Sequence, residues 1–151
     1  MKVRGMTDNV KNFLTKGINR YVFDWEKNES VLQPKDFMRV EDFGGYTEID
    51  FMGEAHIDDT YRAFIEACSI RIDDERKPTC VVLPFRQAWG IHKEDFEKLS
   101  ALYGVDFRLH GFERGMCFSQ EVAVENGETV IDEYTEYDDW DWECPFPYLG
   151  G

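Results

Sequence analysis

The last third of the sequence alternates between apolar and polar residues, and this alternation constrains the fold more than any other feature. The segments VDFRLHGF (105–112), MCFSQEVAVENG (116–127) and ETVIDEYTEY (128–137) each have the two-residue period of a half-buried strand. The pair Asn126-Gly127 is the one that two-residue β-hairpin turns prefer. The sequence therefore predicts a three-stranded antiparallel meander.

The first hundred residues are predicted to alternate between helices and strands. Apolar residues at helical spacing predict helices over 7–18, 60–70 and 92–104. Short aromatic, alternating or continuously apolar runs predict strands over 21–25, 46–53 and 79–85. Residues 26–45 lack a steady period and contain Pro34, Gly44 and Gly45, so they are predicted to be mostly loop. We therefore expect an α+β fold, a mostly antiparallel sheet with helices on one face.

Length and composition fit one folded domain over 1–151, with an acidic strand and tail at 132–151. The chain has 151 residues, of which 42% are hydrophobic and 15% aromatic, which is too apolar for a disordered chain. No apolar run approaches the roughly 18 residues of a membrane helix. The first residues, MKVRGMTDNV, lack the apolar region of a secretory signal, and Met6 is an alternative start. We expect a cytoplasmic protein that does not bind a membrane.

No motif predicts catalysis, a metal or a cofactor. The four cysteines form no CxxC pair and no histidine flanks them at zinc-finger spacing, so they are predicted to be free thiols. The carboxylate clusters at 58–59, 73–75 and 138–139 lack the spacing of a calcium loop. No G-x-S-x-G occurs, and the histidines have no evident nucleophile beside them. We therefore predict that the protein is not an enzyme.

Negative charge is concentrated near the end of the sequence. The chain has 31 acidic and 17 basic residues, a net charge of −14, and no Lys, Arg or His follows Arg114. Such a field repels nucleic acid and favours a basic partner, although negative charge also maintains solubility in many proteins. The candidate partner-binding residues are the acids after Arg114 and two tryptophans among them: Glu121, Glu125, Glu128, Asp132, Glu133, Glu136, Asp138, Asp139, Trp140, Asp141, Trp142 and Glu143.

The segment DEYTEYDDWDWE (132–143) combines seven carboxylates with four aromatic rings. Solvated acidic tails contain few aromatic side chains, and buried strands exclude unpaired charges. Alternate side chains of a strand stand about 7 Å apart, close to the separation of neighbouring phosphates on one DNA strand. We predict that Asp139, Asp141 and Glu143 form such a row, with Trp140 and Trp142 facing the other way. The register of this strand, and so the face that the acids share, stays open.

Residues 79–130 resemble the YubB-like family of plasmid and phage proteins. The resemblance rests on a buried strand that ends in FRQAWG (85–90), a helix that contains LSALYG, and a turn in FERGMCF before the strand that closes on Asn-Gly. It implies a ferredoxin-like variant of the α+β fold and an origin in a mobile genetic element, with the cytoplasm of a bacterial host as its location.

Two functions remain open at this point. The first is an acidic inhibitor of the anti-CRISPR or anti-restriction type, which binds the basic surface of a host nuclease or of a CRISPR or restriction complex as a DNA or RNA mimic. The alternative is a ferredoxin-like module for protein–protein interaction or homodimerisation, without mimicry.

Overall fold

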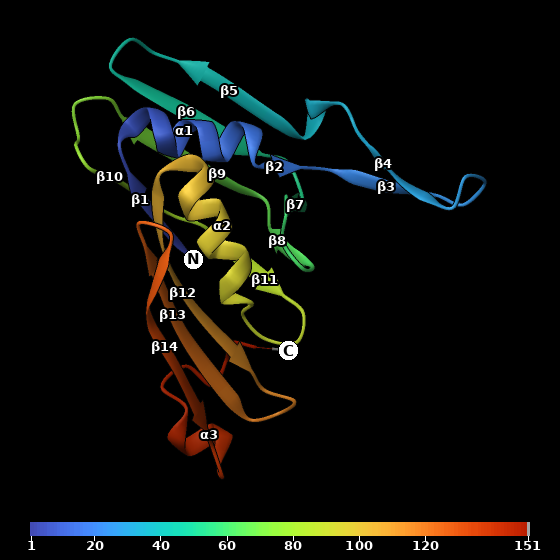
Figure 1. Ribbon diagram of the computed structural model, residues 1–151, viewed down its shortest axis with the longest axis vertical. Coiled ribbons are helices and arrows are strands. Elements are labelled where there is room, and N and C mark those ends of the chain that lie inside the picture. Colours follow the sequence, from blue (N-terminus) through green and yellow to red (C-terminus); the bar gives the residue numbers. More distant parts are fainter. Residues whose placement is uncertain (151) are drawn as a thin grey trace.

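The computed structural model describes residues 1–150 and has an α+β architecture in which every strand pairing is antiparallel (Figure 1). The largest sheet has five strands in the order β10-β1-β12-β13-β14. The strand nearest the N-terminus thus lies between two strands from the second half of the chain. The bounds of these strands are β1 Lys2–Gly5, β10 Thr79–Val82, β12 Val105–Glu113, β13 Phe118–Glu125 and β14 Glu128–Glu136.

Two helices pack on this sheet, α1 (Thr7–Lys16) and α2 (Lys93–Tyr103). Their apolar stripes meet on one aromatic residue of β12. The centroid of the Phe107 ring lies 5.2 Å from that of Phe13 in α1 and 5.3 Å from that of Phe96 in α2, and both contacts are edge to face. Gly104 ends α2 in the left-handed conformation with φ of 63°, which a glycine adopts without strain. These contacts join both helices to the hydrophobic core.

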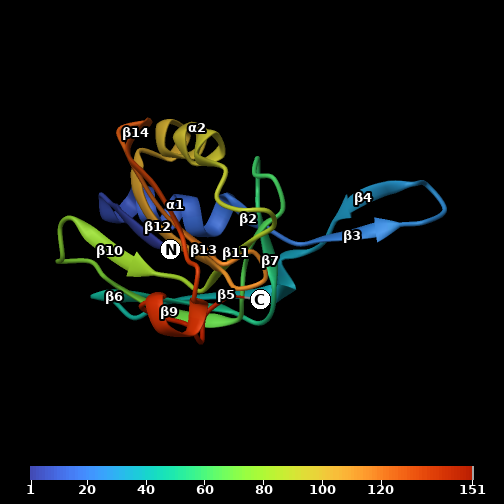
Figure 2. The same cartoon turned by 90° about the horizontal axis from the view of Figure 1, so that it is seen from below.

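Three smaller sheets are formed mainly by the chain between α1 and α2. The sheet β11-β8-β7-β2 and the sheet β5-β6-β9 contribute to the same hydrophobic core as the five-stranded sheet. Among the strands of residues 1–150, β3 and β4 pair only with each other, and the hairpin they form projects from the body (Figures 1 and 2). The bounds are β2 Ile18–Asn19, β3 Tyr21–Asp24, β4 Glu29–Leu32, the 3-10 helix η1 Lys35–Phe37, β5 Met38–Asp42, β6 Tyr46–Phe51, β7 Ala55–Ile57, β8 Ala63–Ile65, β9 Cys68–Asp73 and β11 Phe85–Gln87.

A short helix, α3 (Trp140–Glu143), follows the last strand and is fixed by its first residue. Trp140 is buried, lies edge to face against Tyr137 at 5.5 Å, and donates from Nε1 to the carbonyl of Pro147 at 2.9 Å. Beyond α3, the Phe146 ring reaches Phe112 of β12 at 5.6 Å. The chain after β14 therefore folds back onto the end of the five-stranded sheet. None of the helices in residues 1–150 is both long and apolar enough to span a bilayer.

The meander, the helices near 7–18 and 92–104, and the strands near 46–53 and 79–85 are confirmed. The hairpin turn lies at Asn126-Gly127, where both residues have the positive φ that this turn requires, 53° and 81°. The coarse assignment to an α+β fold with antiparallel sheets is also confirmed.

Two other assignments are wrong. The segment 60–70 is not a helix but contains β8 and the start of β9, because Ala63 and Ile65, then Ile70 and Ile72, alternate into the core. The segment 26–45 is not mostly loop, since it contains β4, η1 and β5. The strands of that segment are largely exposed and therefore have no apolar period in the sequence.

Candidate functional site

The predicted acidic residues of β13 and β14 are divided between the two faces of the sheet. Asp132 lies opposite Val122 and Glu136 opposite Phe118, and these two partners are buried on the core side. The remaining four acids of the two strands point to the other, open face, because neighbours directly opposite each other in a sheet share a face. They are Glu121, Glu125, Glu128 and Glu133.

The four acids on the open face form two cross-strand pairs of like charge, which we call the glutamate pairs. Glu133 lies directly opposite Glu121, and Glu128 lies directly opposite Glu125. Side chains in such positions have Cβ atoms about 4.5–5.5 Å apart, so equal charges repel. The arrangement opposes folding, and a second interaction must offset it.

Among the described residues, a basic partner is found only for the inner member of each glutamate pair, the one on β13. Arg108 donates from Nε to Glu121 Oε1 at 2.9 Å, and Arg4 Nη2 lies 3.4 Å from Glu125 Oε1. Within residues 1–150, the outer members Glu128 and Glu133 form no ion pair, and both are exposed on the edge strand. The sheet therefore presents two uncompensated carboxylates along β14, backed by two compensated ones.

On the core side, Asp132 pairs with a residue of α2. Its carboxylate accepts from Lys93 Nζ at 2.5 Å, and this hydrogen bond raises the pKa of Lys93. Glu136 has no basic partner within the part of the chain that the structure describes. Asp132 therefore helps to hold α2 at the sheet, while Glu136 adds to the negative charge of the β14 edge.

The predicted strand row of Asp139, Asp141 and Glu143 is wrong, because this segment forms a turn and α3. Asp139 caps the helix by accepting from the backbone N–H of Trp142 at 3.3 Å, and Glu143 Oε2 accepts from the backbone N–H of Asp138 at 2.9 Å. Asp141 Oδ1 accepts from Arg114 Nη2 at 3.3 Å.

The two tryptophans do not share a side either: Trp140 is buried, and Trp142 is 87% exposed. A regular row of carboxylates at phosphate spacing is thus not formed here.

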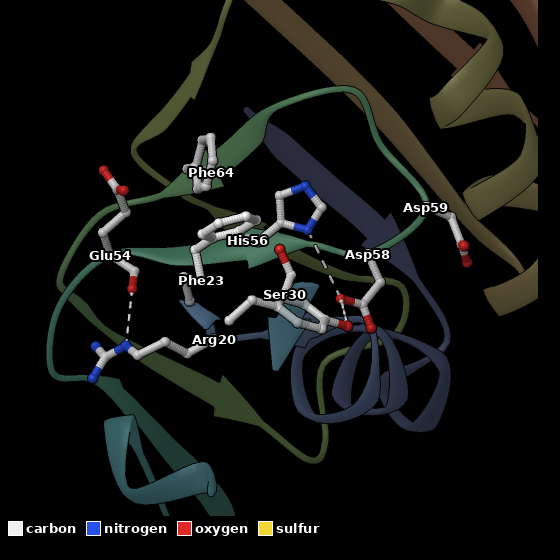
Figure 3. Close-up of a pocket in the computed structure, with 10 residues that line it drawn as sticks. Arg20, Phe23, Ser30, Glu54, His56, Asp58, Asp59 and Phe64 are labelled. Carbon is white, nitrogen blue, oxygen red and sulfur yellow. Dashed lines mark hydrogen bonds and ion pairs between the residues drawn. The ribbon is translucent and has the colours of Figure 1, made fainter. Parts of the chain in front are cut away.

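A second candidate site is a groove between the β3-β4 hairpin and strands β7 and β8. It has a volume of about 550 Å³ and is lined by aromatic and charged side chains. Figure 3 shows His56 of β7 with Phe23 and Phe64 on one side and Asp58 on the other. Sequence reasoning missed this groove because its walls come from two segments distant in sequence, 20–30 and 54–64. The run of aromatic residues at 21–25 indicates a part of one wall but not the contact between the two segments.

The polar centre of the groove is the carboxylate of Asp58. Its Oδ2 accepts from Asn19 Nδ2 at 2.5 Å, and its Oδ1 accepts from the Tyr21 hydroxyl at 3.0 Å. Burial raises the pKa of Tyr21, and the hydrogen bond to Asp58 adds to the shift. The His56 ring lies edge to face with Tyr21 at 5.9 Å and with Phe64 at 5.2 Å, and its Nδ1 is 4.0 Å from Asp58 Oδ1.

The groove contains residue types that also occur in catalytic sites. Ser30, His56 and Asp58 are the residue types of a nucleophilic triad, but no hydrogen bond joins Ser30 to His56 among the described residues. Within residues 1–150, no three His, Cys, Asp or Glu side chains are placed to hold a metal ion. The groove offers aromatic faces and, at its polar centre, the carboxylate of Asp58.

Comparison of this chain with protein-family models, with curated proteins and with solved structures finds no match. The resemblance of residues 79–130 to YubB-like proteins stays a prediction.

Proposed function

We propose that the protein is a non-enzymatic acidic inhibitor from a mobile genetic element. Its β14 edge would bind a basic, nucleic-acid-binding surface of a host nuclease or of a CRISPR or restriction complex, and thereby exclude the nucleic acid. The observation that carries the proposal is the glutamate pairs. Like charges placed opposite each other destabilise a sheet, so their position on an open face is better explained by a basic partner than by folding.

The surroundings of the glutamate pairs support this proposal. Glu136 extends the negative charge along the same strand, and Trp142 beyond it is exposed, as anchor residues of interfaces often are before binding. Charge of this kind accelerates association with a basic surface and makes it sensitive to salt. Mimicry of nucleic acid would then rest on paired carboxylates of the sheet and not on a single row.

The proposal includes a ferredoxin-like variant of the fold with the helices on one face of the five-stranded sheet. It is supported by the contact of both Phe13 and Phe96 with Phe107. The alternative function is a protein–protein interaction or dimerisation module without mimicry. The exposed apolar residues of the β3-β4 hairpin favour that alternative, because they need no charge to bind.

Charge-removing variants separate these functions. The protein, immobilised, is exposed to lysate of a bacterium that carries restriction and CRISPR systems, and bound proteins are eluted with a salt gradient or with duplex DNA. We expect a basic nucleic-acid-binding protein to elute at modest salt and with DNA. The variant Glu128→Gln with Glu133→Gln should lose most of this capture.

The matched control is Glu75→Gln with Glu94→Gln, which removes the same charge from exposed positions outside β13 and β14. This control should retain capture. A partner that resists both salt and DNA, or equal loss in the two double variants, would refute the inhibitor proposal.

A further inference from the structure

The groove beside the β3-β4 hairpin has features that the proposed function does not use. Its lining residues come from the β3-β4 hairpin and from the chain at β7 and β8, and these elements lie away from β14 (Figures 1 and 2). Its volume of about 550 Å³ is in the range of ligand-binding clefts. Its walls come from the hairpin and from β7 and β8, so the position of the hairpin determines its width.

The charged side chains around the groove leave one anion facing its interior. Glu54 turns its carboxylate away to form an ion pair with Arg86, and the side chain of Asp59 points away from His56 (Figure 3). Asp58 accepts two hydrogen bonds from neutral donors, whereas a carboxylate has about four lone-pair positions. It therefore retains room for a cationic donor.

The nearest cations of the chain are already engaged elsewhere. Arg20 donates from Nε to the backbone carbonyl of Glu54 at 3.2 Å, and its guanidinium lies over the Phe37 ring. Lys35 feels the charge of Asp58, which opposes the lowering of its pKa by burial, but its Nζ donates to the carbonyls of Thr15 and Ile18. Within residues 1–150, Asp58 has no ion pair with a Lys or Arg.

Aromatic rings beside a carboxylate favour a guanidinium. Tyr21, Phe23 and Phe64 line the groove together with His56. A guanidinium stacks on ring faces and offers a planar fork of donors to a carboxylate, while an ammonium ion is a compact, strongly hydrated charge. The same chain already uses this contact, since the Arg71 guanidinium lies 3.7 Å from the centroid of Tyr46.

The hairpin indicates that the guanidinium belongs to a polypeptide. Strands β3 and β4 pair only with each other among the described strands, so each has an outer edge that a partner strand can extend. An isolated two-stranded hairpin is marginally stable in water. Trp25 and Leu32 are 85% and 56% exposed, which leaves apolar surface for a partner chain to cover.

We propose that the groove binds an arginine side chain of a polypeptide partner, with the guanidinium on Asp58 and against the rings of Phe23 and Phe64. The extended backbone of the partner would lie along the β3-β4 hairpin. This site is distinct from the glutamate pairs, and its function does not require that they bind a nuclease.

The test is an NMR titration of the ¹⁵N-labelled full chain with N-acetyl-arginine amide. A single side chain is expected to bind in the millimolar range. Backbone signals of 20–23, 54–58 and 64 should shift, while those of β14 should move little. N-acetyl-citrulline amide has a similar shape without the charge and should leave these signals unmoved, and N-acetyl-lysine amide should bind more weakly than the arginine compound.

Variants test the two parts of the site separately. Phe23→Ala should weaken binding about two- to fivefold, the size of one exposed cation–π contact, and Asp58→Asn about tenfold or more. The matched control is Val22→Ala, a neighbour that points to the other face of the same hairpin and does not line the groove.

The outcomes distinguish this inference from the proposed function. Shifts confined to the groove, unchanged in Val22→Ala and in the Glu128→Gln with Glu133→Gln variant, support the arginine site. Equal shifts with citrulline, shifts confined to β14, or no effect of Phe23→Ala would overturn it. Should Asp58→Asn unfold the protein, because an amide NH2 replaces one of its two accepting oxygens, the Phe23→Ala result decides on its own.

Discussion

Replacing both outer glutamates by glutamine should make the protein more stable. Two unit charges about 6 Å apart interact by about 0.7–1.4 kcal/mol at effective dielectric constants of 40–80. Arg108 and Arg4 cancel part of the repulsion, so roughly half of this energy remains for each glutamate pair. The Glu128→Gln with Glu133→Gln variant is therefore expected to gain about 1 kcal/mol in free energy of unfolding at low salt.

Urea unfolding at low salt measures this gain, and thermal unfolding should show a rise in Tm of about 2–4 °C for a chain of this length. The gain should shrink as salt increases, because screening weakens the repulsion. The variant Glu75→Gln with Glu94→Gln removes the same charge elsewhere and is expected to gain nothing, because Glu94 lies in the first turn of α2, where a carboxylate stabilises the helix. A stability equal to that control, or lower than the unchanged protein, would refute the idea that the glutamate pairs oppose folding.

Three further predictions concern the rest of the molecule. Trp140→Ala should expose 138–150 to proteolysis, because it removes a buried ring and its hydrogen bond. The exposed Trp142 is the control, and Trp142→Ala should change the free energy of unfolding by less than about 0.5 kcal/mol. Limited digestion and urea unfolding check both variants. Gly127→Ala should lower the free energy of unfolding by about 1–2 kcal/mol, because φ is +81° there; unchanged stability in urea would contradict the turn geometry. Cys80 should react with iodoacetamide before Cys68, since Cys80 is exposed while burial raises the pKa of the Cys68 thiol; mass spectrometry of partially labelled protein gives the order.

The sequence predicts those elements in which one face is buried and the other is in water. The meander was predictable because its strands alternate and a strongly preferred turn pair joins two of them. The segment 60–70 was assigned wrongly because Tyr61, Phe64, Ile65 and Cys68 have helical spacing by chance. The alternation of Ile70 and Ile72 into the core was the better signal, and β-branched residues favour strands.

The candidate site was predictable in composition but not in arrangement. The sequence identifies the acids that follow Arg114, yet only the register between β13 and β14 places Glu133 opposite Glu121. The chain bends into α3 because Asp139 caps the helix. The alternation of acidic and aromatic residues in this segment indicates a strand instead. The groove depends on contacts between segments distant in sequence, such as that of Tyr21 with Asp58, and no local pattern reports them.

The position of β1 has a consequence for how the chain folds. Lys2 lies opposite Val82 on one side and Arg108 on the other, so β1 cannot be enclosed until much of the chain has been synthesised and can loop back. The hairpins of β12, β13 and β14 close over short loops and can form early. We therefore expect insertion of β1 to be a late, slow step. The hairpin of β13 and β14, with its glutamate pairs, should form before β1 completes the sheet.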